Sequence, residues 1–245
     1  MYKRLVILAV AVVVALTAAV PASAATWIQL RINPSSANWT GSTFADIPMS
    51  WTTTMWGGTL LWTPPGRPWG FRASFDTGSQ VSLTPSGGFD YSDSSGTWTI
   101  WDLSLAYTFM SAAGAWTAFA GWGSGTLTFS GPTYGYSRQI ASGLVLGLDF
   151  RRPLSGNWYI AGSATLGPGQ RYTYEIGAPG TFLGTPGTAT TSIYSVGIGQ
   201  TFSGGSASWE LGWRSGGFTG NGTGSSADGA NIRWSGVYLG VNFIR

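Results

Sequence analysis

The residue types that carry most enzyme chemistry are scarce in this sequence. It contains no His and no Cys, and its single Lys is Lys3. The usual general bases, thiolate nucleophiles and imidazole ligands are therefore missing. Asp90 and Asp93 in the segment FDYSD have a spacing that weakly suits Ca²⁺, although a solvated loop is the more ordinary interpretation. We therefore expect that the chain is not an enzyme and holds no metal or cofactor.

A second set of charged residues is more informative. These residues fall on strand-like stretches, on the face that otherwise carries Gly, Ala, Ser and Thr. Some lie close to a predicted turn and others lie deeper in the stretch, and both groups mix the two signs. Unpaired charges in a narrow interior are costly, so we expect a paired network that crosses that interior. Its predicted members are Arg72, Asp76, Asp102, Asp149, Arg151, Glu210 and Arg214.

The stretches that position these charges alternate with a period of two. Over residues 97–109, one face carries Trp101, Leu103, Leu105, Tyr107 and Phe109, and the other carries small or charged residues. Residues 136–151, 192–202 and 236–243 repeat the pattern, which is typical of strands. A soluble β-sandwich would carry Lys and Glu on its outward face. The pattern instead predicts a barrel with large apolar residues outward and small polar residues filling its lumen.

Composition and the N-terminus agree with a barrel in a membrane. Lys3 and Arg4 precede an apolar stretch that ends near Ala24, which predicts a cleaved signal peptide over residues 1–24. Cleavage would leave one domain over residues 25–245. Twelve basic residues less these two leave ten, against nine acidic residues, so the mature charge of +1 gives no reason to expect nucleic-acid binding. Only 9% of residues are charged, whereas soluble domains average about 25%.

Short turns alternate with longer polar stretches, which predicts an antiparallel up-and-down barrel of ten strands, with eight as the alternative. Short turns are expected at 64–68, 110–114, 152–156 and 203–206. The first strand has the weakest pattern, but dropping it alone would leave an odd number. The predicted strands are 26–33, 51–63, 69–77, 96–109, 115–129, 136–151, 157–173, 189–202, 207–219 and 231–244.

Aromatic residues flank all four short turns at nearly constant spacing. Rings at one height around a barrel are expected at a membrane interface. Cross-strand aromatic pairs beside hairpins are the alternative explanation. The predicted belt, on the periplasmic side, consists of Trp62 and Trp69, Phe109 and Trp116, Phe150 and Trp158, and Phe202 and Trp209.

In these features the chain resembles the small bacterial outer-membrane β-barrels, over the whole mature sequence. The last strand carries the most specific motif, with apolar residues at Val237, Leu239, Val241 and Phe243. In that family the motif is read by the barrel-assembly machinery, so the resemblance implies this machinery as a transient partner. It also implies outer-membrane lipid as the surroundings, in a diderm bacterium. The chain departs from the motif by ending Phe243-Ile244-Arg245 rather than at the aromatic residue.

Three functions remain open on the sequence. The favoured one is an integral outer-membrane barrel, non-catalytic, that is structural or presents its surface loops and has a lumen plugged by charges. A porin-like passive pore for small ions or solutes is the second. The third is a soluble secreted β-protein that binds carbohydrate through exposed Trp residues. A ten-stranded barrel is closer in size to the filled eight-stranded barrels than to the open porins, which favours a plug over a pore.

Overall fold

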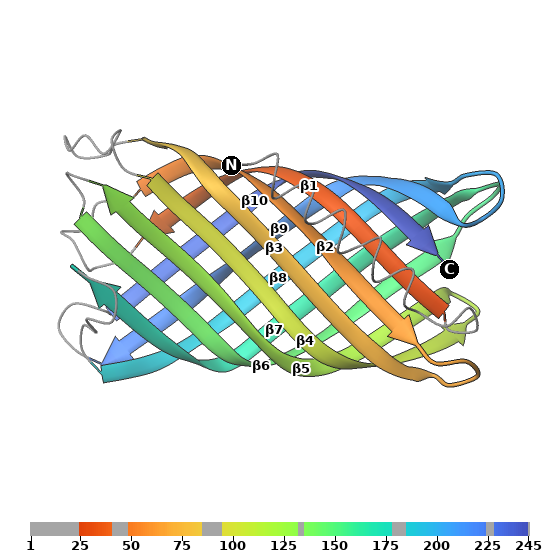
Figure 1. The fold of residues 1–245 in the computed structure, drawn as a ribbon, viewed down its shortest axis with the longest axis horizontal. Helices are drawn as coiled ribbons and strands as arrows, with labels where there is room; N and C mark the ends of the chain where they lie inside the picture. Colours follow the sequence, from red (N-terminus) through yellow and green to blue (C-terminus); the bar gives the residue numbers. More distant parts are fainter. Residues whose placement is uncertain are drawn as a thin grey trace.

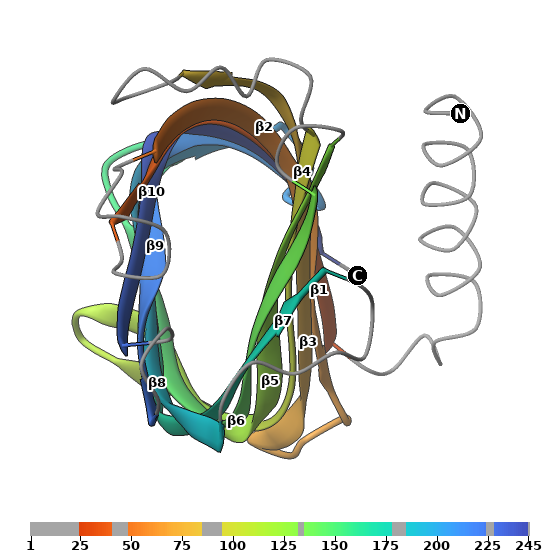
Figure 2. The same ribbon diagram turned by 90° about the vertical axis from the view of Figure 1, so that its left-hand side faces the viewer.

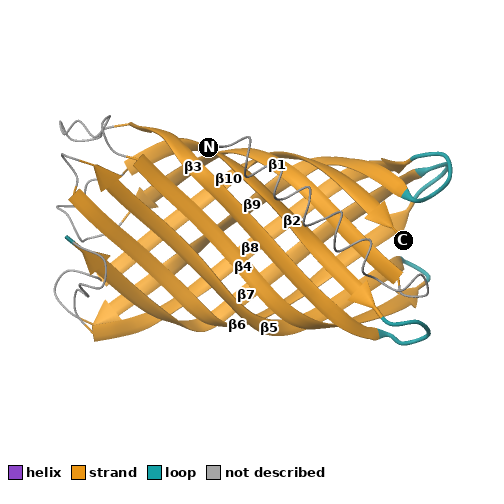
Figure 3. Cartoon of the chain, viewed as in Figure 1, coloured by secondary structure: helices purple, strands orange, loops and turns teal. Residues whose placement is uncertain are grey.

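The computed structural model describes residues 25–40, 49–84, 95–131, 135–177, 185–223 and 228–244. These residues form ten antiparallel strands that close into one barrel, with every strand paired to its neighbours in the chain and β1 paired to β10 (Figures 1 and 3). No helix among them is long and apolar enough to cross a membrane. The strands are β1 (Ala25–Thr40), β2 (Met49–Thr63), β3 (Trp69–Thr84), β4 (Ser95–Ser111), β5 (Gly114–Gly131), β6 (Gly135–Pro153), β7 (Trp158–Ile176), β8 (Thr185–Thr201), β9 (Ala207–Thr223) and β10 (Asp228–Ile244).

The prediction of ten strands is confirmed, and the eight-stranded alternative is wrong. The uncertain first strand is β1, which pairs with both β2 and β10 and so closes the barrel. The predicted signal peptide lies outside the described residues and stays a prediction. Asp90 and Asp93 also lie outside them, so their place in a solvated loop stays a prediction.

The strands extend further toward the long loops than predicted. The stretch predicted over 26–33 continues to Thr40, and the one predicted over 69–77 continues to Thr84. The prediction ended these two strands where the outward face stops carrying large apolar residues. The backbone ladder does not end there, because a strand in water can carry polar residues outward as readily as a strand in lipid carries apolar ones.

The short turns gather at one end of the barrel, on the right in Figure 1, together with the C-terminus. In the turn between β8 and β9, Gly204 and Gly205 have φ values of 106° and 76°. Only glycine adopts such angles without strain, so these two residues allow the tight reversal. We call this the turn end and the opposite one the loop end.

Side chains alternate between the barrel wall's two sides along every strand. In β4, Asp102, Ser104 and Ala106 are buried in the lumen, whereas Leu103 and Leu105 are 58% and 60% exposed. Viewed from the loop end, the barrel is oval, with β9 and β10 on one side and β3 and β4 on the other (Figure 2). The oval is narrow between these two sides, so side chains from opposite strands can meet across it.

Candidate functional site in the barrel lumen

A first ionic cluster is centred on Asp76, which points into the lumen from β3. Arg31 of β1 donates to both of its carboxylate oxygens, at 2.9 and 2.8 Å. Arg214 of β9 donates to Oδ2 at 2.7 Å. Since β3 and β9 lie four positions apart in the ring of ten strands, this cluster spans the lumen. We call Arg31, Asp76 and Arg214 the Asp76 triad.

A second cluster is centred on Arg72, four residues from Asp76 on the same strand. Its Nη1 donates to Asp102 of β4 at 2.6 Å, and its Nε donates to Asp149 of β6 at 2.9 Å. The guanidinium also lies 3.9 Å from the centre of the Phe119 ring, on β5, a distance that suits a cation–π contact. Arg72, Asp102 and Asp149 form the Arg72 triad.

Two other predicted members of the network do not join either triad. Glu210 accepts hydrogen bonds from Tyr238 and, at 3.4 Å, from Tyr159. Arg151 donates to Ser208 at 3.2 Å and to Thr201 at 3.4 Å. Its guanidinium lies 3.6 Å from the centre of the Tyr159 ring. Within the described part of the chain, Arg151 makes no ion pair.

The grouping of the charges differs from the sequence-based prediction in two ways. Residue counts from the nearest turn place Arg72 close to a turn and Asp102 deeper in its strand, yet the two pair directly. Residue counts do not give heights, because barrel strands tilt and their register is staggered. Arg31 was missed as a member, although its position on the inward face of β1, between Gln29 and Asn33, was a usable signal.

The loop-side half of the lumen contains aromatic side chains, so the prediction of a small, polar lumen is wrong there. Trp98 of β4 lies 6.2 Å from Phe218 of β9 and 6.4 Å from Trp234 of β10, between ring centres. β4 and β9 are five positions apart in both directions around the ring, so Trp98 and Phe218 meet across the lumen. The aromatic layer, all at most 3% exposed, consists of Trp51, Trp98, Phe129, Tyr172, Phe218 and Trp234.

Glycines on neighbouring strands make room for aromatic rings in the lumen. A Cβ placed on Gly216 would lie 2.6 Å from the Trp234 ring, and one on Gly147 would overlap the ring of Phe119. The sequence did carry the signal for the layer. Trp98 and Trp234 have the same parity as Asp102 and Tyr238 on their strands, and that parity places them inside.

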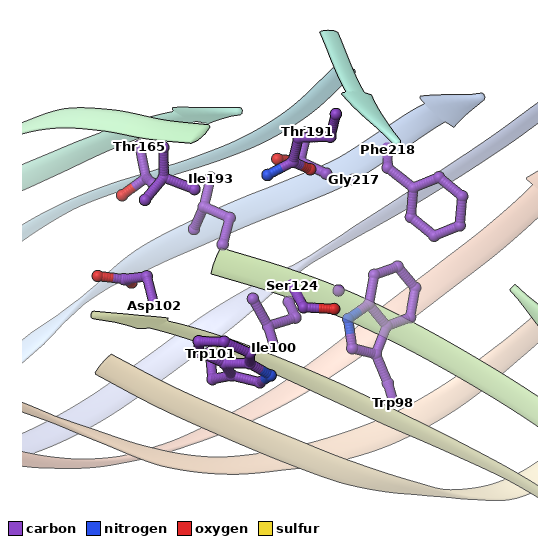
Figure 4. Close-up of a pocket in the computed structure, with 13 residues that line it drawn as sticks. Trp98, Ile100, Trp101, Asp102, Ser124, Thr165, Thr191, Ile193, Gly217 and Phe218 are labelled. Carbon is purple, nitrogen blue, oxygen red and sulfur yellow. The ribbon is translucent and has the colours of Figure 1, made fainter. Parts of the chain in front are cut away.

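Two cavities lie on the turn side of this layer. A small one, of about 30 Å³, lies between the aromatic layer and the charged residues. Figure 4 shows Trp98 and Phe218 at one side of it and Asp102 at the other. A larger cavity, of about 220 Å³, is lined by all six residues of the two triads. We call it the lumen cavity. Among the described residues no cluster of His, Cys, Asp or Glu could hold a metal ion.

Two rows of aromatic rings lie on the outer wall. The eight predicted belt residues lie at or beside the turn end, and several contact one another, such as Trp116 with Phe150 at 5.4 Å and Trp158 with Trp209 at 5.6 Å. A second row, which was not predicted from the sequence, lies nearer the loop end. This outer girdle, each ring 41–57% exposed, consists of Trp56, Phe75, Trp101, Trp122, Tyr194 and Trp213.

Between the two rows the outer wall is apolar, with Leu, Val and Ile exposed on most strands. Val237, Leu239, Val241 and Phe243 belong to this band and are 37–50% exposed. Beyond the outer girdle the outward residues become polar, as with Thr97 and Thr99 on β4. An apolar band between aromatic girdles is the outer surface expected of a β-barrel in a bilayer.

Solved structures with a similar arrangement are outer-membrane proteins. The outer membrane protease OmpT from Escherichia coli matches with a TM-score of 0.55 and 11% identity, over 92% of this chain and 97% of that one. This chain has the fold of the bacterial outer-membrane β-barrels. The translocator domain of the autotransporter NalP from Neisseria meningitidis matches at a TM-score of 0.45, with 10% identity over 92% and 89% of the two chains. Neither a family model nor a curated protein sequence matches.

The outer-membrane β-barrel predicted from the sequence is thus confirmed in its fold and location, and the soluble sugar-binding alternative is wrong. The prediction that the chain is not an enzyme is contradicted by the likeness to a protease. That prediction rested on residue types alone, whereas OmpT, which has a similar barrel fold, is a protease. At 11% identity the likeness shows the fold and transfers no catalytic residue to this outer-membrane barrel.

Proposed function

We propose that this outer-membrane barrel is closed to diffusion and holds a rigid, protruding rim above the membrane. One observation carries the proposal, namely the contact of Trp98 with Phe218 between opposite strands. With the rest of the aromatic layer, these rings fill the lumen on the loop side. Below them the Arg72–Asp149 and Arg214–Asp76 ion pairs join strands that lie three and four positions apart in the ring.

The length of the strands supports the protruding rim. A tilted strand needs about 9–11 residues to cross a bilayer, and these strands have 15–19. The apolar band occupies the turn-side part of each strand, so the surplus lies on the loop side. There the wall has apolar residues inside and polar residues outside, as in a protein in water. A barrel built in this way presents its long loops on a stable base.

A narrow pore is the second candidate, and the lumen cavity favours it. The cavity extends from the triads to Thr108, Ala115 and Arg151, which are partly exposed near the turn end. Only the aromatic layer and the ion pairs then separate it from the loop end. Movement of a few side chains would connect the two ends.

Conductance across a planar bilayer separates the two candidates. The closed barrel predicts no conductance steps from the wild type, and steps after the double substitution Trp98→Ala and Phe218→Ala removes the contact. Steady steps from the wild type would favour the pore and contradict the closed barrel. The substitution Leu103→Ala on the lipid side of β4 is the matched control, since it leaves the lumen intact.

We infer in addition that the last strand carries an assembly signal. Its apolar residues face outward and are not covered by other parts of the described chain, so the barrel-assembly machinery that the resemblance implies can contact them. The substitution Phe243→Ala would then reduce the amount of folded barrel in cells but leave refolding in detergent unchanged. Equal losses in both assays would contradict an assembly role.

A further inference from the structure

The two triads carry opposite net charges although they line the same cavity. In the Asp76 triad two guanidinium groups share one carboxylate, which leaves one positive charge. In the Arg72 triad one guanidinium is shared by two carboxylates, which leaves one negative charge. The lumen cavity therefore has a positive pole and a negative pole, with no net charge between them.

Each pole also has one buried atom that makes no hydrogen bond. In the part of the chain that the structure describes, Nη1 of Arg214 and Oδ1 of Asp149 have no partner. Arg214 is only 6% exposed, whereas the side chain of Asp149 is 24% exposed and only its Oδ1 atom is buried. A buried charged group with an unmade hydrogen bond is costly, so such an atom indicates a missing partner.

The other charged groups on the cavity wall are better satisfied. Both oxygens of Glu210 accept hydrogen bonds from tyrosine hydroxyls, and Arg151 donates to two hydroxyl groups. The unmade hydrogen bonds thus single out one donor at the positive pole and one acceptor at the negative pole.

We propose that the lumen cavity binds a small zwitterion, whose carboxylate contacts Arg214 and whose ammonium group contacts Asp149. A free α-amino acid is the simplest molecule of this class. Its two opposite charges match the two poles, whereas a simple cation or anion would leave one pole unmatched. The cavity also has an apolar wall that includes Leu61, Ile100 and Ile193, which suits an aliphatic side chain.

The size and position of the cavity fit this class of ligand. Its volume of about 220 Å³ lies below the 300–1,000 Å³ that is usual for drug-sized ligands. The aromatic layer closes the loop side, so the ligand enters from the turn end, which is the periplasmic side in barrels of this kind. Binding does not depend on whether the barrel conducts, and the experiment that follows is independent of the conductance measurement.

Calorimetric titration of the folded barrel in detergent tests the proposal. Glycine and L-leucine are the zwitterionic probes, while 4-methylpentanoate and 3-methylbutylamine are leucine without its ammonium group and without its carboxylate. We expect at least one zwitterion to bind and both single-charge analogues of leucine to bind on the order of tenfold more weakly, or not at all. If neither zwitterion binds, or if an analogue binds as tightly as the better of the two zwitterions, the proposal is wrong.

The substitution Asp149→Asn locates the site. It removes the negative charge but keeps an oxygen for Arg72, so the barrel should still fold, which heat-modifiable gel mobility checks. Zwitterion affinity should fall on the order of tenfold, and any residual binding of 4-methylpentanoate should not change. The exposed Arg152→Gln at the turn end is the control. An unchanged zwitterion affinity in folded Asp149→Asn would overturn the assignment.

Discussion

Asp76 illustrates, at the scale of one residue, why the charged side chains in the lumen are paired. Its carboxylate is 2% exposed and accepts from two guanidinium groups that reach it from β1 and β9. A buried charge is tolerated only when it is paired and its hydrogen bonds are made. The two arginines depend on Asp76 in turn, because no other carboxylate among the described residues pairs with either of them.

The substitution Asp76→Asn should therefore destabilise the barrel strongly. It leaves Arg31 and Arg214 close together and without a counter-charge, and breaking a buried pair in this way costs about 3–5 kcal/mol. Denaturant unfolding in detergent, followed by tryptophan fluorescence, measures the change in the free energy of unfolding. The exposed substitution Arg152→Gln should change it by about 0.5 kcal/mol or less. Similar small effects for both variants would contradict the role of the triad.

At the scale of the element, each strand combines two patterns of polarity: its outward residues are apolar below the outer girdle and polar above it. On β4, Leu103 and Leu105 face outward below the outer girdle and Thr97 and Thr99 face outward above it. The inward residues change in the opposite sense, from Asp102 and Ser104 to Trp98. The strand therefore has a lipid-facing part and a water-facing part without any break in its hydrogen bonds.

Arginine on the outer face of β4 should distinguish these two parts. The substitution Leu103→Arg places a cation in the apolar band, where the cost is about 2–4 kcal/mol near the bilayer midplane. The substitution Thr97→Arg changes a residue of the same parity above the outer girdle, where the cost should be about 0–1 kcal/mol. Unfolding from phospholipid vesicles measures both. Equal costs would show that the apolar band does not end at the outer girdle.

The sequence was sufficient for the strands and their number, but only in part for the lumen. Alternation predicted the outward side of Trp101, Leu103 and Leu105, because parity along a strand is a local property. It could also have placed Trp98 and Trp234 inside, had the change of polarity been followed past Asp102. Alternation could not predict the pairing of Arg72 with Asp149, because that pairing depends on the stagger of three intervening strand pairs.

On the scale of the whole molecule, the two halves of the barrel have different interiors for one reason. In the turn-side half the barrel faces lipid, so its apolar residues point outward. The lumen there contains the two triads and the lumen cavity. In the loop-side half, which we propose protrudes into water, the outward residues are polar, and the apolar residues form a core that would close the lumen. The aromatic layer is then a consequence of the strands' length, and the outer girdle marks the height at which the change occurs.

Site-directed labelling tests this claim directly, since the chain has no native Cys to interfere. Single cysteines replace Thr97 and Leu103 on β4, and Arg233 and Leu239 on β10, all on the outer face of the wall. A membrane-impermeant maleimide is then added to intact cells. The account predicts rapid labelling of the cysteines at 97 and 233 and little labelling of those at 103 and 239 until the membrane is dissolved by detergent. Equal protection of all four positions in intact cells would contradict it, because the barrel would then lie within the membrane over its full length.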